Sequence, residues 1–336
     1  MRIFPAILFT CLLLLTASVD LAEAKPKHLF KIGSLAPEGS VWVTQFHKFA
    51  KEVEEQTSGE VAFRVYTGGI MGDDQAMYRK MRVGQLQGGG FTMTGIAQVV
   101  PDFRVMALPF LFTSYSEVDA VTAGLLPSFK KQFAEKGLEL VAMTEVGFIY
   151  TMSTMPIVSI TDLQQAVCWT PAGDPVSAAY LAHLGITPIQ LSIPDVLSSL
   201  QTGLVNTVFN SLYGSIVLQW FTKAKFINEL PFGYAYGALL LDKKALARLS
   251  AGHAAIIQAT ADKYFPPLIA ETRKSNEDSR AVLAKNGVQF TESPADVAEQ
   301  LQSLREKTAR DIVGSSFSIE IYQETTRLLE KFRSGQ

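Results

Sequence analysis

The chain has 336 residues and a mass of 36.8 kDa, a length typical of two domains of about 150 residues each. Hydrophobic residues make up 48% of the sequence and charged residues 18%, which excludes a disordered, collagenous or coiled-coil chain. The 30 Lys and Arg residues nearly balance the 32 Asp and Glu residues. Because nucleic-acid binding needs a basic surface, this balance argues against nucleic acid as a partner.

Residues 1–24 have the features of a signal peptide. Arg2 supplies a positive charge, residues 3–15 form an apolar stretch, and Ala22-Glu23-Ala24 matches the small-x-small site that a signal peptidase cuts. A membrane anchor is disfavoured because the stretch is shorter than the roughly 20 residues that span a bilayer. We therefore predict export and a mature chain that starts near Lys25. Cys11 would be removed with this segment, which leaves Cys168 without a partner for an internal disulfide.

Strands and helices alternate along the first half of the chain. Apolar alternation predicts the strands, helical spacing of apolar residues predicts the helices, and glycines mark helix ends. The expected elements are a strand over 28–33, a helix from the N-cap Ser40 to Gly59, a strand over 61–65, a helix over 74–83, a strand over 91–93, a helix over 116–136 and a strand over 138–143. This order predicts an open α/β sheet.

The second half repeats this order and then becomes helical. The expected elements are helices over 176–184 and 194–202 and strands over 189–191 and 205–209. They predict a second α/β lobe. After Leu241 the pattern is helical, and the long helix over 254–286 contains Pro266-Pro267, which we expect to kink or break it.

Signatures of catalysis and of metal or cofactor binding are absent from the sequence. The four histidines are scattered, and there is no HExxH zinc motif, G-x-S-x-G nucleophile elbow, P-loop or G-x-G-x-x-G dinucleotide turn. Gly88-Gly89-Gly90 precedes a predicted strand, whereas a phosphate-binding loop precedes a helix. Cys168 lies between Val167 and Trp169, with no neighbouring cation to activate the thiol. We therefore predict a protein that is not an enzyme and that holds no metal and no cofactor.

Five short motifs stand together in one order along the chain. They are Ala36-Pro37-Glu38-Gly39-Ser40, Met71-Gly72-Asp73-Asp74, Pro101-Asp102-Phe103 with Leu108-Pro109-Phe110-Leu111-Phe112, Asp162-Leu163, and Leu200-Gln201-Thr202-Gly203. In this combination the sequence resembles the DctP-type substrate-binding subunits of tripartite ATP-independent periplasmic (TRAP) transporters. The resemblance covers almost all of the chain after residue 24.

The resemblance implies a two-lobed periplasmic-binding-protein fold of α/β class, with a long helix that bridges both lobes. It implies a periplasmic protein that closes on one small ligand between the lobes and delivers it to membrane permease subunits. The expected division is residues 1–24 as signal peptide, 25–146 plus about 236–275 as lobe I, and 147–235 plus about 276–336 as lobe II.

The sequence departs from the family where relatives bind a carboxylate. Family members usually have an Arg two positions before a Pro in the stretch that follows Asp-Leu, and this chain has Trp169. Many have a second Arg after a Gly-aromatic pair, and here Gly147-Phe148 is followed by Ile149. Only the amide at Asn210 remains from a polar Gln-Glu-Asn run in the family.

Losing these cations changes the expected ligand. A buried carboxylate without its partner loses about 3 to 5 kcal/mol, whereas micromolar binding amounts to about 8 kcal/mol in total. We therefore predict an uncharged cleft wall and a hydrophobic or amphipathic ligand. The candidate wall residues are Trp169, Ile149, Asn210, Phe148, Ile193, Phe209 and Tyr213 from the second lobe and Leu35, Trp42 and Met93 from the first. The alternative for several of them, above all Trp42 and Phe148, is packing in the core.

Other functions remain open from sequence alone. The chain could bind an organic acid through a relocated cation, could be a secreted hydrolase or isomerase, or could be an interaction protein with a filled cleft in which Trp169 collapses on Phe209. A small branch of TRAP-like binding subunits that lack both cations works with a periplasmic tetratricopeptide-repeat protein, which is a further candidate partner.

Overall fold

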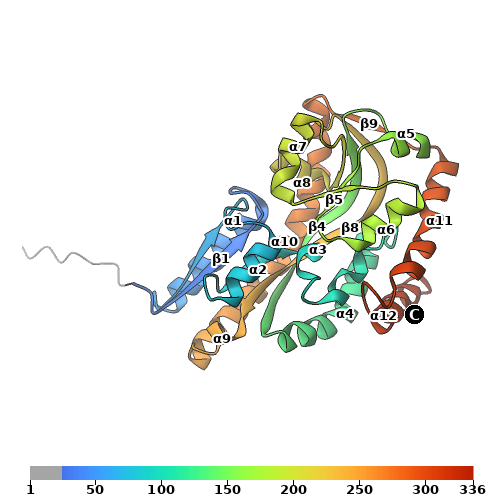
Figure 1. Cartoon of the computed structure of the whole chain (residues 1–336). Coiled ribbons are helices and arrows are strands. Elements are labelled where there is room, and N and C mark those ends of the chain that lie inside the picture. Colours follow the sequence, from blue (N-terminus) through green and yellow to red (C-terminus); the bar gives the residue numbers. More distant parts are fainter. Residues whose placement is uncertain (1–24, 336) are drawn as a thin grey trace, which may run out of the picture.

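The computed structural model describes residues 25–335, so the predicted signal peptide with Cys11 lies outside the described residues. Figure 1 shows a mixed α/β molecule. The strands are β1 (His28–Ser34), β2 (Val61–Tyr66), β3 (Gly88–Thr92), β4 (Leu138–Ser153), β5 (Trp169–Pro171), β6 (Ile189–Leu191), β7 (Thr207–Asn210), β8 (Phe226–Asp242) and β9 (Gln289–Thr291). The main sheet has the order β2-β1-β3-β8-β4-β7, with β9 also paired to β8, and β5 pairs with β6 in a separate sheet.

Helices cover this sheet and extend to the C-terminal part. They are α1 (Val41–Gln56), α2 (Asp74–Arg82), α3 (Met93–Ile96), α4 (Tyr115–Glu135), α5 (Ile160–Gln165), α6 (Pro175–His183), α7 (Val196–Thr202), α8 (Leu212–Val217), α9 (Lys243–Leu246), α10 (Ala251–Lys285), α11 (Ala295–Ile312) and α12 (Ile319–Arg333), with 3₁₀ helices η1 (Pro101–Ala107), η2 (Ile193–Asp195) and η3 (Trp220–Thr222). In Figure 1, β1, α1, α2 and α9 lie at one end and α5, α7, α8 and β9 at the other. The expected α/β class and two-lobed fold are thus present.

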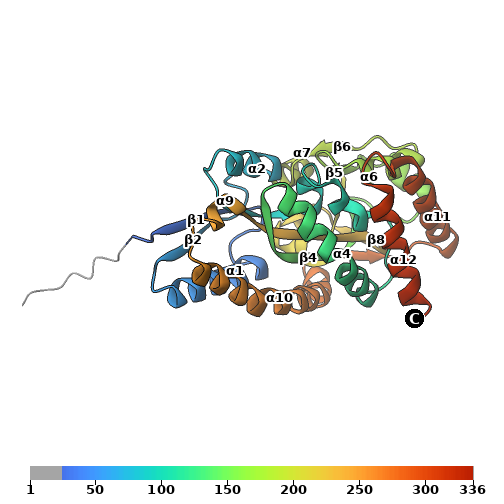
Figure 2. The same cartoon turned by 90° about the horizontal axis from the view of Figure 1, so that it is seen from below.

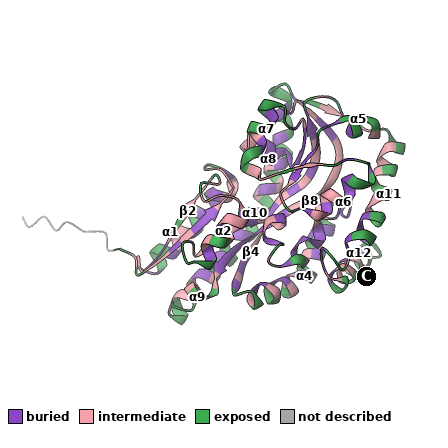
Figure 3. Cartoon of the chain, in the orientation of Figure 1, coloured by how far each residue is buried: buried purple, intermediate pink, exposed green. Residues whose placement is uncertain are grey.

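The strand β8 joins both ends of the molecule and was not expected from the sequence. It pairs antiparallel with β4 from Asp242 opposite Leu138 to Phe226 opposite Ser153. Its residues from Tyr236 to Leu241 are all buried, as expected of a strand covered on both faces, and Figure 3 shows the buried strands between more exposed helices. Continuous burial from Tyr236 to Leu241 removes the period of two there, and Pro231 interrupts the apolar pattern, so a strand signal remains only over 232–237, where aromatic and small residues alternate.

The three consecutive glycines lie inside β3, although we expected the strand to begin after them. A Cβ on Gly88 would lie 2.5 Å from the Leu240 backbone oxygen on the paired strand β8. A Cβ on Gly89 would lie 2.7 Å from the Phe91 ring. Close strand packing therefore requires glycine at positions 88 and 89, and the strand begins at Gly88, which corrects the predicted boundary.

The long helix α10 is continuous over 35 residues, although we expected Pro266-Pro267 to kink or break it. The two prolines are exposed, whereas the neighbouring Phe265 and Leu268 are buried. Water can therefore reach the carbonyl groups that lose their helical partners, while the buried side chains hold the helix in place. The helix packs on α1, β4 and α8 and bridges the two lobes, as Figure 2 shows from below.

The C-terminal helices also contact both parts of the molecule. Helix α11 packs on α6, and α12 packs on α4. At the α12 end, Arg333 Nε donates to Glu117 Oε1 at 2.8 Å. On α11, Arg305 Nη1 donates to the Phe110 backbone oxygen at 3.1 Å. The predicted lobe division, which places 276–336 with lobe II, stays a prediction, and it separates α12 from the helix on which it packs.

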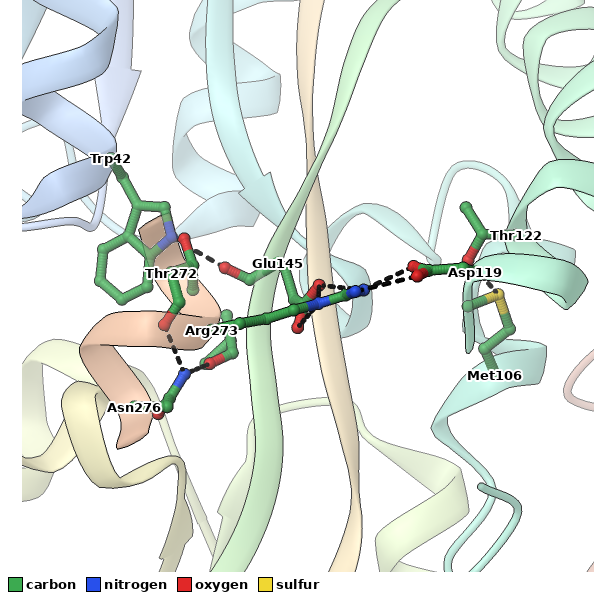
Figure 4. Close-up of polar contacts among 9 residues, drawn as sticks. Trp42, Met106, Asp119, Thr122, Glu145, Thr272, Arg273 and Asn276 are labelled. Atoms are coloured by element: carbon green, nitrogen blue, oxygen red, sulfur yellow. Dashed lines mark hydrogen bonds and ion pairs between the residues drawn. The ribbon is translucent and has the colours of Figure 1, made fainter. Parts of the chain in front are cut away.

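A buried ion pair fixes β4 to α10 and α4. Figure 4 shows Arg273 between Glu145 and Asp119. The Arg273 Nε lies 3.2 and 3.0 Å from the two Glu145 carboxylate oxygens, and Nη1 lies 2.9 Å from Asp119 Oδ2. The Glu145 side chain is 1% exposed. Burial raises the pKa of this carboxyl, and the hydrogen bonds from Arg273 oppose that shift, so Glu145 depends on Arg273 to stay ionised.

We predict that Arg273→Met lowers the free energy of unfolding by about 3 to 5 kcal/mol, because it leaves the Glu145 carboxylate buried without a partner. Urea denaturation monitored by circular dichroism measures this change. As a control, Arg327→Met removes an exposed partner of Glu324 on α12 and should cost less than about 1 kcal/mol. Equal losses in the two variants would contradict the role given to the buried pair.

Candidate functional site

A cavity of about 250 Å³ lies where the two lobes face each other. On one side it is lined by the segment after β1, the start of α1, the end of β3 and the start of α3. On the other side it is lined by β4, β5, β7, α8 and the segment of β8 around Phe232 to Gly237. A cavity between lobes, formed by the ends of strands, is a typical site for a small ligand.

No Lys, Arg or His is found among the described residues that line this cavity. Asp174 is the one Asp or Glu side chain in that lining, and it sits at the N-cap of α6. Its Oδ1 accepts hydrogen bonds from the backbone N–H groups of Val176 and Ser177 at 3.0 and 3.2 Å. The wall itself therefore offers no fixed positive charge to a carboxylate.

Trp169 lies in the wall at the start of β5 and is 3% exposed. Its Nε1 donates to the Leu191 backbone oxygen at 3.0 Å, and its ring makes an edge contact with Trp220 at 5.2 Å between centroids. The indole nitrogen is thus used within the protein. What Trp169 presents to the cavity is apolar ring surface.

Ile149 and Phe209 line the cavity from the adjacent strands β4 and β7. The Phe209 ring stacks on Phe232 at 4.8 Å between centroids, while Trp169 pairs with Trp220. The two candidate wall residues therefore have different ring partners, and the cavity remains between the lobes. This arrangement does not favour the alternative in which Trp169 collapses on Phe209.

Asn210 was expected to contribute a side-chain amide to the cleft wall. The residue is buried and lines the cavity, and its Oδ1 accepts the Ser211 N–H at 2.8 Å. A Cβ on Gly214 would lie 2.3 Å from this oxygen, so only glycine at the start of α8 leaves room for it. The contact fixes the Asn210 carbonyl, and the amide nitrogen is the group that can donate to a ligand.

Leu35, Met93 and Ile193 complete the candidate residues that line the cavity, together with Trp42. The Trp42 Nε1 donates to the Glu145 backbone oxygen at 2.8 Å, as Figure 4 shows. Trp42 therefore links α1 to the strand that carries the buried ion pair.

Two candidate residues lie outside the lining. Phe148 packs on Tyr115 and Tyr234, at 4.9 and 5.9 Å between ring centroids. Because neighbouring residues in a strand point to opposite faces, Phe148 cannot face the cavity while Ile149 does. This corrects the expectation for Phe148.

Tyr213, on α8, connects the two lobes and is not part of the lining. Its hydroxyl oxygen accepts the Val41 N–H at 2.9 Å, and its ring lies 5.1 Å from that of Trp42. Its own N–H donates to Asn276 Oδ1 on α10 at 3.0 Å. The expectation that Tyr213 forms wall is corrected, because its side chain is directed at α1.

Several lining residues were missed at the sequence level. Phe232, Tyr234 and Tyr236 line the cavity from β8, which was not expected as a strand. The alternation of aromatic and small residues over 232–237 was the signal that could have found them.

A second, smaller crevice of about 30 Å³ lies between the lobes beside Asp74. Asp74 begins α2, and its two oxygens accept from the Thr92 N–H at 3.0 Å and the Thr92 hydroxyl at 2.7 Å. Burial raises the pKa of Asp74 to about 6, and the hydrogen bonds from Thr92 oppose the shift.

Within residues 25–335, the free cysteine is buried and no metal-binding cluster is found. Burial raises the pKa of the Cys168 thiol to about 12, which keeps it neutral and unreactive. No group of three His, Cys, Asp or Glu side chains in these residues could hold a metal ion. Within the same range, none of the helices has the length and apolar character needed to cross a membrane.

Comparisons with known proteins agree with a two-lobed solute-binding fold. The family model for DctP, described as bacterial extracellular solute-binding protein, family 7, matches residues 32–313. A solute-binding protein of Roseobacter denitrificans is 26% identical over 87% of this chain and 90% of its own length. The ectoine-binding periplasmic protein TeaA of Halomonas elongata is 22% identical over 88% of this chain and 86% of its own.

Solved structures show the same fold. A TRAP periplasmic solute-binding protein from Desulfovibrio salexigens with bound orotic acid has a TM-score of 0.83 at 22% identity, covering 92% of this chain and 99% of the other. The sugar acid binding protein DctPAm from Advenella mimigardefordensis, in complex with galactonate, has a TM-score of 0.84 at 20% identity, covering 91% and 99%.

We predict that Tyr213→Phe loosens the contact between α1 and α8, because it leaves the Val41 N–H without its acceptor. Small-angle X-ray scattering should show a larger radius of gyration in the ligand-free variant, with a loss in unfolding free energy of only about 1 kcal/mol. Tyr78→Phe, at a partly buried position that packs against the core away from α8, is the matched control. An unchanged radius of gyration in Tyr213→Phe would contradict this role.

We predict that Asp74 makes stability depend on pH. Its folded-state pKa of about 6 lies above the ordinary value of 3.8, so the folded protein holds the proton more tightly than the unfolded chain. Stability should therefore fall by about 2.4 kcal/mol as the pH rises from about 4 to about 7. Unfolding curves of the wild type and of Asp74→Asn, recorded at several pH values in this range, measure the free energy of unfolding. The part of its pH dependence that Asp74 contributes should be absent from Asp74→Asn. Asp262→Asn, at an exposed position, controls for the loss of one charge.

Proposed function

Because this chain belongs to the DctP family of bacterial extracellular solute-binding proteins, and is a TRAP-type periplasmic solute-binding protein, we propose that its cleft captures a ligand with an apolar body. Proteins of this type bind small ligands and work with membrane permease components.

The observation that carries this proposal is the composition of the cavity wall. The family resemblance implies cations at the positions of Trp169 and Ile149, and these two apolar residues line the cavity. Phe209, Ile193, Leu35 and Met93 extend the apolar surface on both sides. Burial of hydrocarbon against such a wall contributes about 25 cal/mol per Å². A highly hydroxylated ligand would instead lose hydrogen bonds to water that this wall cannot replace.

The relatives with known ligands differ on this point. The structures named above hold orotic acid and galactonate, both of which are acids. A carboxylate needs a cation or several N–H donors, and the wall offers the amide nitrogen of Asn210 in their place. We therefore infer that this protein selects a different class of ligand, with Asn210 as one polar contact.

We propose that two lobes close on the ligand. One lobe consists of residues 25–146 and about 236–275, and the other consists of residues 147–235 and about 276–335. The contacts of Tyr213 with Val41 and Trp42 would hold these lobes together over the ligand. Export through cleavage near Ala24 stays a prediction. A tetratricopeptide-repeat partner finds no support in the cleft or the relatives and is not part of the proposal.

Catalysis is not part of the proposed function. A hydrolase needs a nucleophile, a base and an orienting acid that converge on the substrate. Among the described residues of the lining, Asp174 is an acid, but no His, Cys or Lys lies with it.

We predict that affinity for linear alcohols rises about fourfold for each added methylene from n-butanol to n-octanol, because each buried methylene contributes about 0.8 kcal/mol. Isothermal titration calorimetry with the purified protein measures the series. Galactonate and orotate, under the same conditions, should bind at least tenfold more weakly than n-octanol. Tight binding of galactonate with no dependence on alcohol length would refute the proposal.

A matched pair of variants tests the wall itself. Ile193→Ser removes apolar surface from the cavity and should weaken n-octanol binding about fivefold or more. Ile319→Ser changes an exposed isoleucine on α12 and should leave binding unchanged.

A further inference from the structure

Phe110 has a backbone conformation that large residues rarely adopt. Its φ is 55°, which lies in the left-handed region. It follows Pro109 in a tight turn that is closed by the Leu111 N–H, which donates to the Leu108 backbone oxygen at 3.2 Å. Glycine or asparagine is the usual residue at the third position of a turn with this φ. A phenylalanine here therefore indicates that the side chain has a role that outweighs the backbone strain.

The turn separates Phe110 from its neighbours in the chain. Leu108 and Leu111 are buried in the hydrophobic cluster that contains residues of η1 and α4. The Phe110 ring is instead buried in a second cluster, together with Ile149 and Phe209. Both of these partners line the cavity between the lobes. The strained turn thus brings an aromatic ring into the cluster that supplies part of the cavity wall.

Phe110 contacts one wall residue, Phe232, through both its backbone and its ring. Gly233 and Pro231 of β8 lie opposite two consecutive residues of β4, so the intervening Phe232 is an extra residue in this pairing. Its backbone oxygen accepts the Phe110 N–H at 2.9 Å, and the two rings make an edge contact at 5.9 Å between centroids. Because a bulge changes the direction of its side chain, these contacts fix where the Phe232 ring points.

Phe232 is held from within the wall and from behind it. Its ring stacks on Phe209 at 4.8 Å between centroids, and both residues line the cavity. It also makes an edge contact with Tyr180 at 5.1 Å, and the Tyr180 ring lies 6.0 Å from that of Phe110. Phe110 and Tyr180 are not among the described residues that line the cavity. They therefore form a second layer behind Phe232.

We propose that Phe110 is a positioning residue that limits the length of the hydrocarbon the cavity accepts. This inference rests on the proposed function and adds a size limit to the ligand class. The packed Phe110 ring prevents Phe232 from moving away from the cavity. Without that ring, the cluster contains a space into which Phe232 can move, and the cavity becomes deeper at this part of its wall.

The test extends the n-alkanol series to n-dodecanol, with isothermal titration calorimetry as the measurement. In the wild type, the gain of about fourfold for each methylene should stop at the alcohol whose chain reaches Phe232. In Phe110→Ala the gain should continue to longer alcohols. The first alcohol beyond the wild-type limit should therefore bind Phe110→Ala at least about fourfold more tightly than the wild type. Alcohols below the limit should bind the two proteins with similar affinity.

Three further variants separate the size of the side chain from the stability of the fold. Phe110→Leu keeps part of the apolar volume and should move the limit less than Phe110→Ala does. Phe110→Gly should have the same limit as Phe110→Ala but unfold at a higher temperature, because glycine adopts a positive φ without strain. Phe133→Ala removes a buried ring of α4 outside the lining, and it should lower the unfolding temperature without moving the limit.

The outcomes distinguish this inference from the proposed function. An identical limit in the wild type, Phe110→Ala and Phe110→Leu, or a wild-type series that rises up to n-dodecanol, would overturn the inference and leave the proposed function intact. An equal shift of the limit in Phe133→Ala would also overturn it. If Phe110→Ala does not fold, the comparison of Phe110→Leu with the wild type decides. If the wild type shows no dependence on alcohol length, the proposed function itself fails.

Discussion

The antiparallel pairing of β4 with β8 is the constraint on which the cleft depends. These two strands run through both lobes, and the rest of the main sheet is built outward from them. The ion pair of Arg273 with Glu145 ties β4 to α10, and Trp42 bonds the backbone oxygen of the same Glu145. A change at this point would therefore move the long helix, the first helix and the cleft wall together.

The same region contains an irregularity in the strand pairing. The pairing of β4 with β8 shifts register between Glu145 and Gly147. Gly147 has a φ of 108°, and a Cβ there would lie 2.7 Å from Asn276 Nδ2, so both backbone and space require glycine. Asn276 in turn bonds the Val146 backbone oxygen and the Tyr213 N–H. The Asn276 side chain on α10 thus connects the irregular part of the β4–β8 pairing to Tyr213, which contacts the opposite lobe.

The cleft wall offers mainly apolar surface and no cation. In the proposed function, Trp169, Ile149 and Phe209 would give the ligand hydrocarbon to contact, and Asn210 would give it one amide.

The sequence by itself determined the local elements and the chemistry of the wall. Ser40 caps its helix as expected, and Trp169 and Ile149 are apolar at positions where the family resemblance implies cations. Tertiary structure alone decided that β8 pairs along its whole length with β4, that Phe148 faces away from the cavity and that Tyr213 contacts the opposite lobe. Each of these depends on contacts between residues far apart in the chain, such as β4 with β8 or α8 with α1, and no local pattern encodes which side chains such contacts leave paired or exposed.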